Sequence, residues 1–255
     1  MKRTRTYIWQ LLLVIGVVLY SGSACSGKQK KNDLLQTADW HFQMAGGYFE
    51  SHEIPLAIKE LNTALEISPN HEQAHHLLGF IYFGRRNYPK ALAHLRTAVE
   101  IKPTFHSARN NLGALYLATE RWKEAIEEFE QLVDEPLYPT PELAHNNIGW
   151  AQFNQNQFAE ALESFRMAVF LKPEFCLAHN NNGLTYLKLQ NPIQARKSFE
   201  RAIKKCANNY AEPHFHLGKL LEQEGNPDSQ YHFQRCVDIS PESNWALRCQ
   251  QYLGI

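Results

Sequence analysis

Histidine is the residue type in this chain best suited to bind a metal ion or to transfer protons near neutral pH. The 255-residue sequence contains twelve histidines, and His71, His75 and His76 lie close together along the chain. His71 and His75 are four residues apart and would share one face of a helix, but no third zinc ligand accompanies them. We therefore predict no metal site and no bound cofactor.

Other residue types give no better catalytic candidate. The sequence lacks a Gly-x-Ser-x-Gly turn, a phosphate-binding glycine-rich loop and a His-Glu-x-x-His pair. Glu124, Glu127 and Glu128 are spaced as on a helix surface, where carboxylates are normally solvated. We expect no catalytic residues and no enzymatic activity. Twenty-six basic residues balance 26 acidic ones, so nucleic acid is not an expected partner either.

The first 25 residues have the features of a bacterial export signal. A basic start, Lys2, Arg3 and Arg5, precedes an apolar run over residues 9–20 and then Ser21-Gly22-Ser23-Ala24-Cys25. The apolar run is too short for a stable membrane span. We predict a signal peptide over residues 1–24 and a flexible polar tether over residues 25–34.

The cysteine after these small residues resembles the lipidation site of bacterial lipoproteins. Cys25 would then become the mature N-terminus and carry acyl chains that anchor the protein in a membrane. Gly22 stands where such signals usually have Leu, and ordinary signal cleavage near Ala24 is the alternative. Ser26 follows the cysteine, which by resemblance to Gram-negative lipoproteins favours the periplasmic face of the outer membrane.

The remainder of the chain repeats a helical pattern at intervals of about 34 residues. In one copy Leu78-Gly79 is followed by Ala91 and Leu95, and in the next Leu112-Gly113 is followed by Ala125 and Phe129. Small residues at two fixed places let two antiparallel helices approach closely, and a proline ends the second helix. The pattern resembles the tetratricopeptide repeat (TPR). It predicts an all-α TPR solenoid, a right-handed superhelix, with six helix hairpins over residues 35–242 and a capping helix over residues 243–255.

The repeat also accounts for most of the histidines. The fourth place of a copy, which often carries a large aromatic residue, is occupied by His41, His75, His145, His179 and His214. We interpret these histidines as packing residues.

Four cysteines lie in the last third of the chain, and an exported protein can form disulfides. Repeat geometry favours Cys176 with Cys206, because the first opens a helix and the second closes its antiparallel partner. It also favours Cys236 with Cys249, which would join the last hairpin to the terminal helix. The alternative is that these cysteines are small apolar core residues, since Cys236 occupies a core alanine place.

The first helices of TPR hairpins line the concave face of the superhelix. Its exposed places are rich in aromatic and amide side chains, which is typical of a protein-binding surface. The candidates are Phe42, Phe49, His76, Phe80, Phe83, Asn110, Leu117, Asn146, Trp150, Phe153, Asn180, Leu184 and Leu187. Amides could hold the backbone of a partner segment while the rings bind its apolar side chains, so we expect an apolar ligand segment. In the alternative, part of the stripe packs against the neighbouring repeats.

One irregularity in the spacing of the repeats narrows the choice of protein family. The spacing lengthens to 36 residues between the third and fourth copies, through a proline-rich insertion that contains Leu137-Tyr138-Pro139. Six TPR copies behind a lipoprotein signal, with this insertion and the following Asn147-Ile148-Gly149, resemble the type IV pilus pilotins of the PilF, PilW and Tgl type. The resemblance implies an outer-membrane lipoprotein that binds a secretin subunit and promotes its targeting and multimerisation. A periplasmic TPR lipoprotein that scaffolds cell-wall enzymes or another envelope complex is the alternative.

Overall fold

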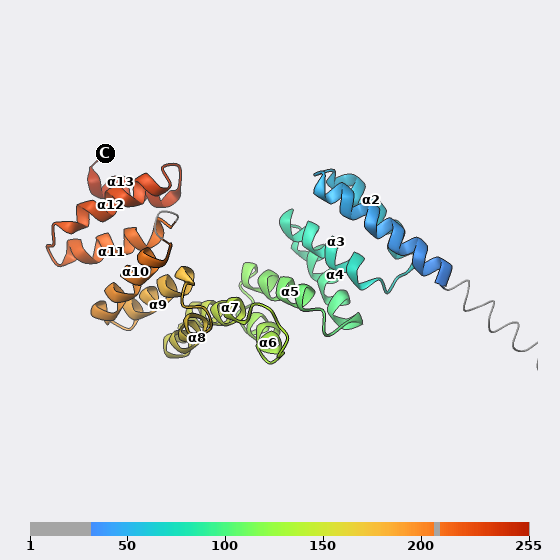
Figure 1. The fold of residues 1–255 in the computed structure, drawn as a ribbon, viewed down its shortest axis with the longest axis horizontal. Coiled ribbons are helices and arrows are strands. Elements are labelled where there is room, and N and C mark those ends of the chain that lie inside the picture. Colours follow the sequence, from blue (N-terminus) through green and yellow to red (C-terminus); the bar gives the residue numbers. More distant parts are fainter. Residues whose placement is uncertain (1–31, 207–209, 255) are drawn as a thin grey trace, which may run out of the picture. The chain divides into compact units, whose positions relative to one another are not determined.

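The computed structural model describes residues 32–206 and 210–254, and the regular secondary structure in these ranges is α-helical (Figure 1). The predicted signal peptide and Cys25 lie outside the described residues. Residues 32–34, assigned to the tether from the sequence, are already helical, so the first helix begins earlier than predicted. Within the described ranges, no helix is both long enough and apolar enough to cross a bilayer.

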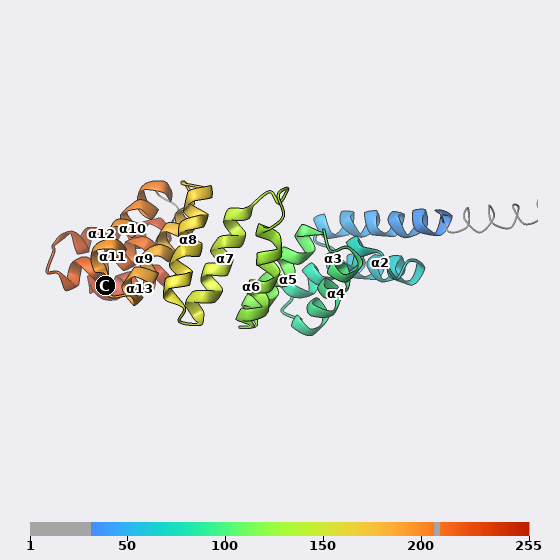
Figure 2. The same cartoon turned by 90° about the horizontal axis from the view of Figure 1, so that it is seen from below.

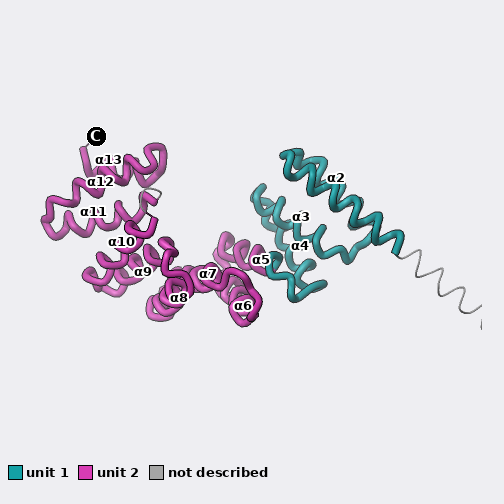
Figure 3. The backbone as a smooth tube through the Cα atoms, in the orientation of Figure 1, with its two compact units in different colours: residues 1–108 teal, residues 109–255 magenta. Residues whose placement is uncertain are grey.

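The chain divides into two compact units, residues 1–108 and 109–255, and the boundary falls inside α5 (Figure 3). In the first unit, residues 32–50 form one helix. It is followed by α2 (Ile54–Ile67), α3 (Glu72–Gly84), α4 (Tyr88–Ile101) and the start of α5 (His106–Ala118).

The second unit contains the rest of α5 and eight further helices within its described residues. These are α6 (Trp122–Val133), α7 (Pro141–Asn154), α8 (Phe158–Leu171), α9 (Cys176–Lys188), α10 (Pro192–Cys206), α11 (Glu212–Gln223), α12 (Asp228–Ile239) and α13 (Asn244–Leu253). Consecutive helices pack as hairpins, α7 on α8 and α9 on α10, and α13 packs on α12 (Figures 1 and 2). The predicted all-α fold of stacked TPR-like hairpins is confirmed.

In five of the six hairpins, a glycine of the first helix lies against the large core residue of the second helix. A Cβ atom added to Gly183 of α9 would lie 2.4 Å from the ring of Phe199 on α10. A Cβ atom added to Gly149 of α7 would lie 2.8 Å from the ring of Phe165 on α8. Both rings are completely buried. The large core residue of the second helix therefore fits only because the facing residue of the first helix is glycine, which has no side chain.

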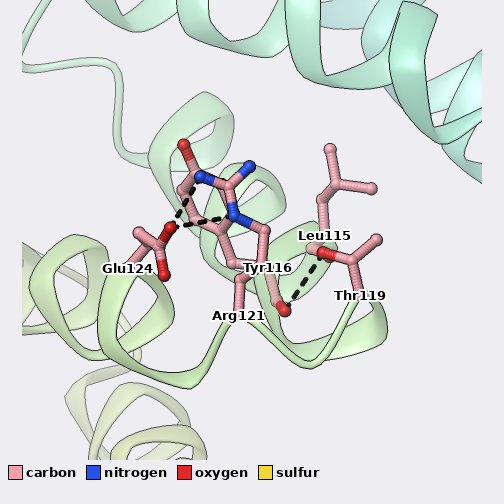
Figure 4. A network of polar contacts seen from close by, with 5 residues as sticks. All are labelled: Leu115, Tyr116, Thr119, Arg121 and Glu124. Atoms are coloured by element: carbon pink, nitrogen blue, oxygen red, sulfur yellow. Dashed lines mark hydrogen bonds and ion pairs between the residues drawn. The ribbon is translucent and has the colours of Figure 1, made fainter.

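The turn between α5 and α6 shows how one hairpin is closed (Figure 4). The Arg121 guanidinium donates to Oε1 of Glu124 from Nε at 2.9 Å and from Nη2 at 2.6 Å. The same guanidinium lies 4.5 Å from the centre of the Tyr116 ring. The Thr119 hydroxyl donates to the carbonyl of Leu115 at 2.8 Å. Thr119 thus satisfies a backbone carbonyl near the end of α5, and Arg121 links Tyr116 of α5 to Glu124 of α6.

Each hairpin turn contains one residue with a left-handed backbone. Positive φ angles of 55° to 68° occur at His52, Arg86, Glu120, Asn156, Gln190 and Gly225. Five of these six residues carry a side chain, for which the left-handed conformation costs roughly 1–2 kcal/mol. The packing of the two helices imposes the turn even where the local residue disfavours it.

The proline-rich insertion forms the connection between α6 and α7. Tyr138 is buried, and its hydroxyl donates to Oδ1 of Asn110 on α5 at 3.4 Å. The neighbouring Leu137 is 87% exposed. The loop is therefore anchored by Tyr138 and presents Leu137 to solvent.

Two disulfides brace the C-terminal part of the second unit. Cys176 at the start of α9 is bonded to Cys206 at the end of α10, with a Cα–Cα distance of 5.8 Å. Cys236 of α12 is bonded to Cys249 of α13, with a Cα–Cα distance of 6.3 Å. These are the two pairs that the repeat geometry favours.

Candidate partner-binding site

Three of the five fourth-place histidines, His41, His75 and His214, pair with the second helix of their own hairpin. Nδ1 of His75 lies 3.0 Å from Nδ1 of His94, and Nδ1 of His214 lies 2.9 Å from Nδ1 of His232. His41 lies 2.6 Å from the carboxylate of Glu60 in the same way. In these three hairpins, the polar bridge explains the position of the histidine ring.

The bridging histidines have little free coordinating capacity. Nε2 of His75 donates to the carbonyl of Pro69 at 3.0 Å, so its Nδ1 is left to accept from the Nδ1–H of His94. Burial, followed by the nearby charges of His75 and Lys90, lowers the pKa of His94 to about 4. In the described part of the chain, no three His, Cys, Asp or Glu side chains come together as a metal site would require.

In the first unit, the first-helix face, meaning the surface built by the first helix of each hairpin, is aromatic. Phe42 and Phe49 are half-buried against the core formed around Ala45 and Leu61. The ring of Phe49 meets the edge of Phe80, with centroids 5.9 Å apart, and Phe80 is 43% exposed. Phe80 is therefore supported from below and offers apolar surface to a partner.

The other two candidates of this unit are less accessible. His76 is half-buried and contacts the edge of Phe105, with centroids 4.8 Å apart. Burial lowers the pKa of His76, which favours the neutral ring. Phe83 is half-buried beside Tyr88, with centroids 6.2 Å apart.

In the second unit, the first-helix face carries an aromatic stack on α7. Trp150 lies parallel to Phe153 with centroids 5.6 Å apart, and Phe153 contacts the edge of Phe158 at 5.4 Å. Trp150 is 36% exposed. The stack fixes the indole in place and leaves part of it open.

Two of the predicted groove amides are not exposed. Asn146 and Asn180 are buried, with 4% and 0% of their surface exposed. Asn146 faces the next hairpin, where its Oδ1 accepts from Nδ2 of Asn181 at 2.9 Å. The prediction that both amides stand free on the surface is wrong, because the neighbouring first helix lies close enough to cover them.

Asn180 is unusual even among buried amides. Both its side-chain nitrogen and its side-chain oxygen lack a hydrogen-bond partner. A buried polar group in this condition costs about 1–3 kcal/mol. Asn180 is close enough to the Glu212 carboxylate to lower the pKa of that group.

A pocket of about 310 Å³ opens beside these amides. It lies between α7, α9 and the start of α11, and we call it the amide–carboxylate pocket; its lining residues are Asn146, Asn147, Trp150, Leu177, Asn181 and Glu212. Glu212 is the first residue of α11, and its side chain is 20% exposed. The pocket therefore combines amides, one carboxylate and the edge of the aromatic stack.

Glu212 is held as a carboxylate. Burial alone would raise its pKa, but hydrogen bonding and the charge of His216, together with Asn180 and Tyr210, lower it overall. The Tyr210 hydroxyl donates to Oε2 at 3.2 Å, and burial raises the pKa of Tyr210 well above its usual range. Nε2 of His216 is 3.5 Å from Oε1, within ion-pair range but too long for a good hydrogen bond, and Asn180 contributes without a bond of ordinary length.

The three leucines and Asn110 complete the predicted set. Leu184 and Leu187 are half-buried and pack against the core around Phe199, so much of their surface covers the hairpin interior. Leu117 is also half-buried, and Asn110 accepts the bond from Tyr138. Part of the stripe packs within the protein, as the alternative interpretation states.

Sequence reasoning missed Glu212. Acidic residues are common in the first turn of a helix, and Glu72 and Glu142 stand at similar places in α3 and α7. Nothing local to Glu212 separates it from these ordinary helix-start carboxylates. The signal lies in the copies beside it, where α7 contributes two adjacent asparagines and α9 contributes three.

Comparisons with known proteins agree with this fold. Two family models described as tetratricopeptide repeat match residues 82–136 and 110–174. No curated protein sequence gives a significant match.

Among solved structures, PilW, a widely conserved type IV pilus biogenesis factor, superposes with a TM-score of 0.72 at 24% identity, over 86% of this chain and 99% of PilW. PilF of Pseudomonas aeruginosa gives a TM-score of 0.70 at 19% identity, over 85% of this chain and 98% of PilF. YrrB, described as a TPR protein with an unusual peptide-binding site, gives 0.54 at 18% identity, over 75% of this chain and 97% of YrrB. The resemblance stated from the sequence is thereby confirmed at the level of the fold.

Proposed function

We propose that this chain is a pilotin-type TPR lipoprotein of type IV pilus biogenesis. In this role it is anchored in the outer membrane through acyl chains on Cys25, facing the periplasm. It binds a secretin subunit with its first-helix faces and promotes the delivery of that subunit to the outer membrane and its multimerisation.

The similarity to PilW and PilF carries the proposal. It extends over nearly the whole of both proteins and over more than four fifths of this chain. The export signal that ends at Cys25 supports the same role, because a pilotin must reach the envelope and stay on a membrane. Several acyl chains give stable anchoring, whereas a single chain binds only weakly.

The side chains of the first-helix faces support binding rather than catalysis. Phe80 and Trp150 offer supported aromatic surface of the kind that anchors protein partners. A subunit held on these surfaces is shielded from aggregation until it meets other subunits. The protein would act stoichiometrically, one molecule for each subunit delivered.

A Cys25→Ala variant tests the membrane-delivery role. We expect the variant protein to leave the membrane fraction and the amount of denaturation-resistant secretin multimer to fall. Ser26→Ala is the matched control and should change neither. If membrane location and multimer yield both stay unchanged in Cys25→Ala, the pilotin proposal is contradicted.

Copurification separates the pilotin role from the envelope-adaptor alternative. Secretin recovered with the mature protein supports the proposal. Cell-wall hydrolases or synthases recovered in place of secretin contradict it and favour the adaptor.

A further inference from the structure

We propose that the amide–carboxylate pocket binds a cationic side chain, arginine or lysine, from the protein segment that occupies the first-helix face of the second unit. The inference rests on the proposed function only in taking a protein segment as the ligand. It adds a charge requirement to the apolar segment expected from the sequence.

The carboxylate of Glu212 lines the pocket and is partly exposed there. Among the described residues, no lysine or arginine pairs with this carboxylate. Its neighbours are the neutral hydroxyl of Tyr210, 3.2 Å from Oε2, and the imidazole of His216, 3.5 Å from Oε1. An anionic ligand would be repelled, and an apolar side chain would remove water from the carboxylate without replacing it. A guanidinium or ammonium group supplies both the opposite charge and the donors.

Asn180 lies behind the pocket lining with unsatisfied polar atoms. This residue is completely buried, and both polar atoms of its side chain lack partners. It lies on α9 between the lining residues Leu177 and Asn181, but it is covered and is not itself a lining residue. It is also close enough to Glu212 to affect that carboxylate. A guanidinium has five N–H donors, enough to bind the Glu212 carboxylate and the side-chain oxygen of a lining asparagine together.

The Trp150 indole at the rim of the pocket also favours a cation. Trp150 lines the pocket and is partly exposed, and its parallel contact with Phe153 holds it in position. Cations bind favourably over an indole face, and an arginine also stacks on it. An arginine could therefore reach Glu212 with its charged end while its stem lies along the ring.

The size of the pocket fits one side chain. Its volume of about 310 Å³ lies at the lower end of the range of roughly 300–1,000 Å³ for small-ligand sites. The pocket thus holds one side chain of the bound segment, and the other residues of the segment contact the surrounding face.

The test uses two blocked pentapeptides, Ala-Leu-Arg-Leu-Ala and the same peptide with citrulline in place of arginine. Citrulline has nearly the same shape as arginine but no charge. Binding to the full mature chain is followed through the indole N–H signal of Trp150, identified with a Trp150→Phe variant. We expect the citrulline peptide to bind about tenfold more weakly or worse, and the affinity of the arginine peptide to fall as salt rises.

Glu212→Gln should reduce binding of the arginine peptide to the level of the citrulline peptide. Glu222→Gln, an exposed carboxylate later on the same helix, is the matched control and should leave binding unchanged. If Glu212→Gln fails to fold, the arginine–citrulline difference in the unaltered protein still decides the matter. Equal affinity for the two peptides, or no shift of the Trp150 signal with either, overturns the inference.

This outcome is separate from that of the pilotin proposal. If the arginine peptide is preferred while Cys25→Ala leaves secretin assembly unchanged, the pocket inference stands and the pilotin role fails. If assembly depends on Cys25 but the two peptides bind equally, only the pocket inference fails.

Discussion

The two units build their first-helix faces from the same repeat and give them different chemistry. In the first unit, Phe80 rests on Phe49 and the exposed surface is apolar. In the second unit, Trp150 borders a pocket that ends in Glu212. A helix-hairpin scaffold with the same internal contacts can therefore present an apolar surface in one unit and a polar, charged one in the other. The units also differ in covalent bracing, since both disulfides lie in the second.

The largest expected difference between the units is their response to reduction. The disulfides close segments with sequence separations of 30 and 13 residues. Loops of this size contribute about 3–4 kcal/mol each to the free energy of unfolding, mainly by restricting the unfolded chain. Treatment with dithiothreitol should therefore increase amide hydrogen exchange in α9–α13 and leave α2–α4 unchanged.

The matched control is a Cys176→Ser/Cys206→Ser/Cys236→Ser/Cys249→Ser variant, which should exchange like the reduced protein with or without dithiothreitol. Equal acceleration of exchange in α2–α4 on reduction would contradict the assignment of bracing to the second unit alone.

The next largest expected difference concerns how the two first-helix faces bind the partner. Phe80→Ala and Trp150→Ala should each weaken secretin binding by about 2 kcal/mol or more, because exposed and supported aromatic residues dominate interface energies. Rising salt should weaken the interaction that remains in Phe80→Ala more than the one that remains in Trp150→Ala. The measurement is surface plasmon resonance at several salt concentrations.

Phe170→Ala serves as the control for these two variants. This side chain is 78% exposed and lies on α8, a second helix of a hairpin, so its loss should not affect binding. Undiminished binding in both Phe80→Ala and Trp150→Ala would remove the first-helix faces as the partner site.

The histidine pairs should give the two units a similar dependence of stability on pH. In the folded protein, burial and the partner ring lower the pKa of His94 and of His214 to about 4, from an ordinary value of 6.5. The unfolded chain therefore binds more protons than the folded one between these values. Stability is fully present above pH 6.5 and falls as the pH drops toward about 4, by about 1–2 kcal/mol per pair after allowance for solvent screening.

Urea unfolding between pH 7 and pH 4 measures this loss. His94→Gln should reduce the dependence in the first unit and His214→Gln in the second. A variant that keeps the full pH dependence of its unit would show that protonation of other groups causes the loss of stability.

The smallest expected effect concerns the turns. Gln190→Gly should stabilise the second unit by up to about 1 kcal/mol, because glycine adopts a positive φ without a steric penalty. Arg86→Gly should do the same in the first unit. Thermal unfolding measures both changes, and Gly225→Ala should shift the midpoint the opposite way.

The sequence predicts the scaffold better than the site. The positions of Gly183 and Phe199 depend only on packing within one hairpin, and a period near 34 residues records that packing in every copy. The exposure of Asn146 and Asn180 depends instead on the spacing between neighbouring hairpins, which no single copy encodes. Glu212 joins the site for the same reason, because it meets Asn180 only after α9 and α11 are stacked. The cysteine pairs could be anticipated because their partners lie in one hairpin or the next helix.

The two disulfides also determine how the chain yields to mechanical load. When the chain is pulled from its ends, the residues inside the closed loops cannot extend, even after their helices unravel. At about 3.3–3.6 Å per residue, this withholds roughly 140 Å of contour length. A single-molecule extension trace of the oxidised protein should therefore end short of that of the reduced protein by this amount. The oxidation state of four cysteines thus sets the maximum reach of the molecule.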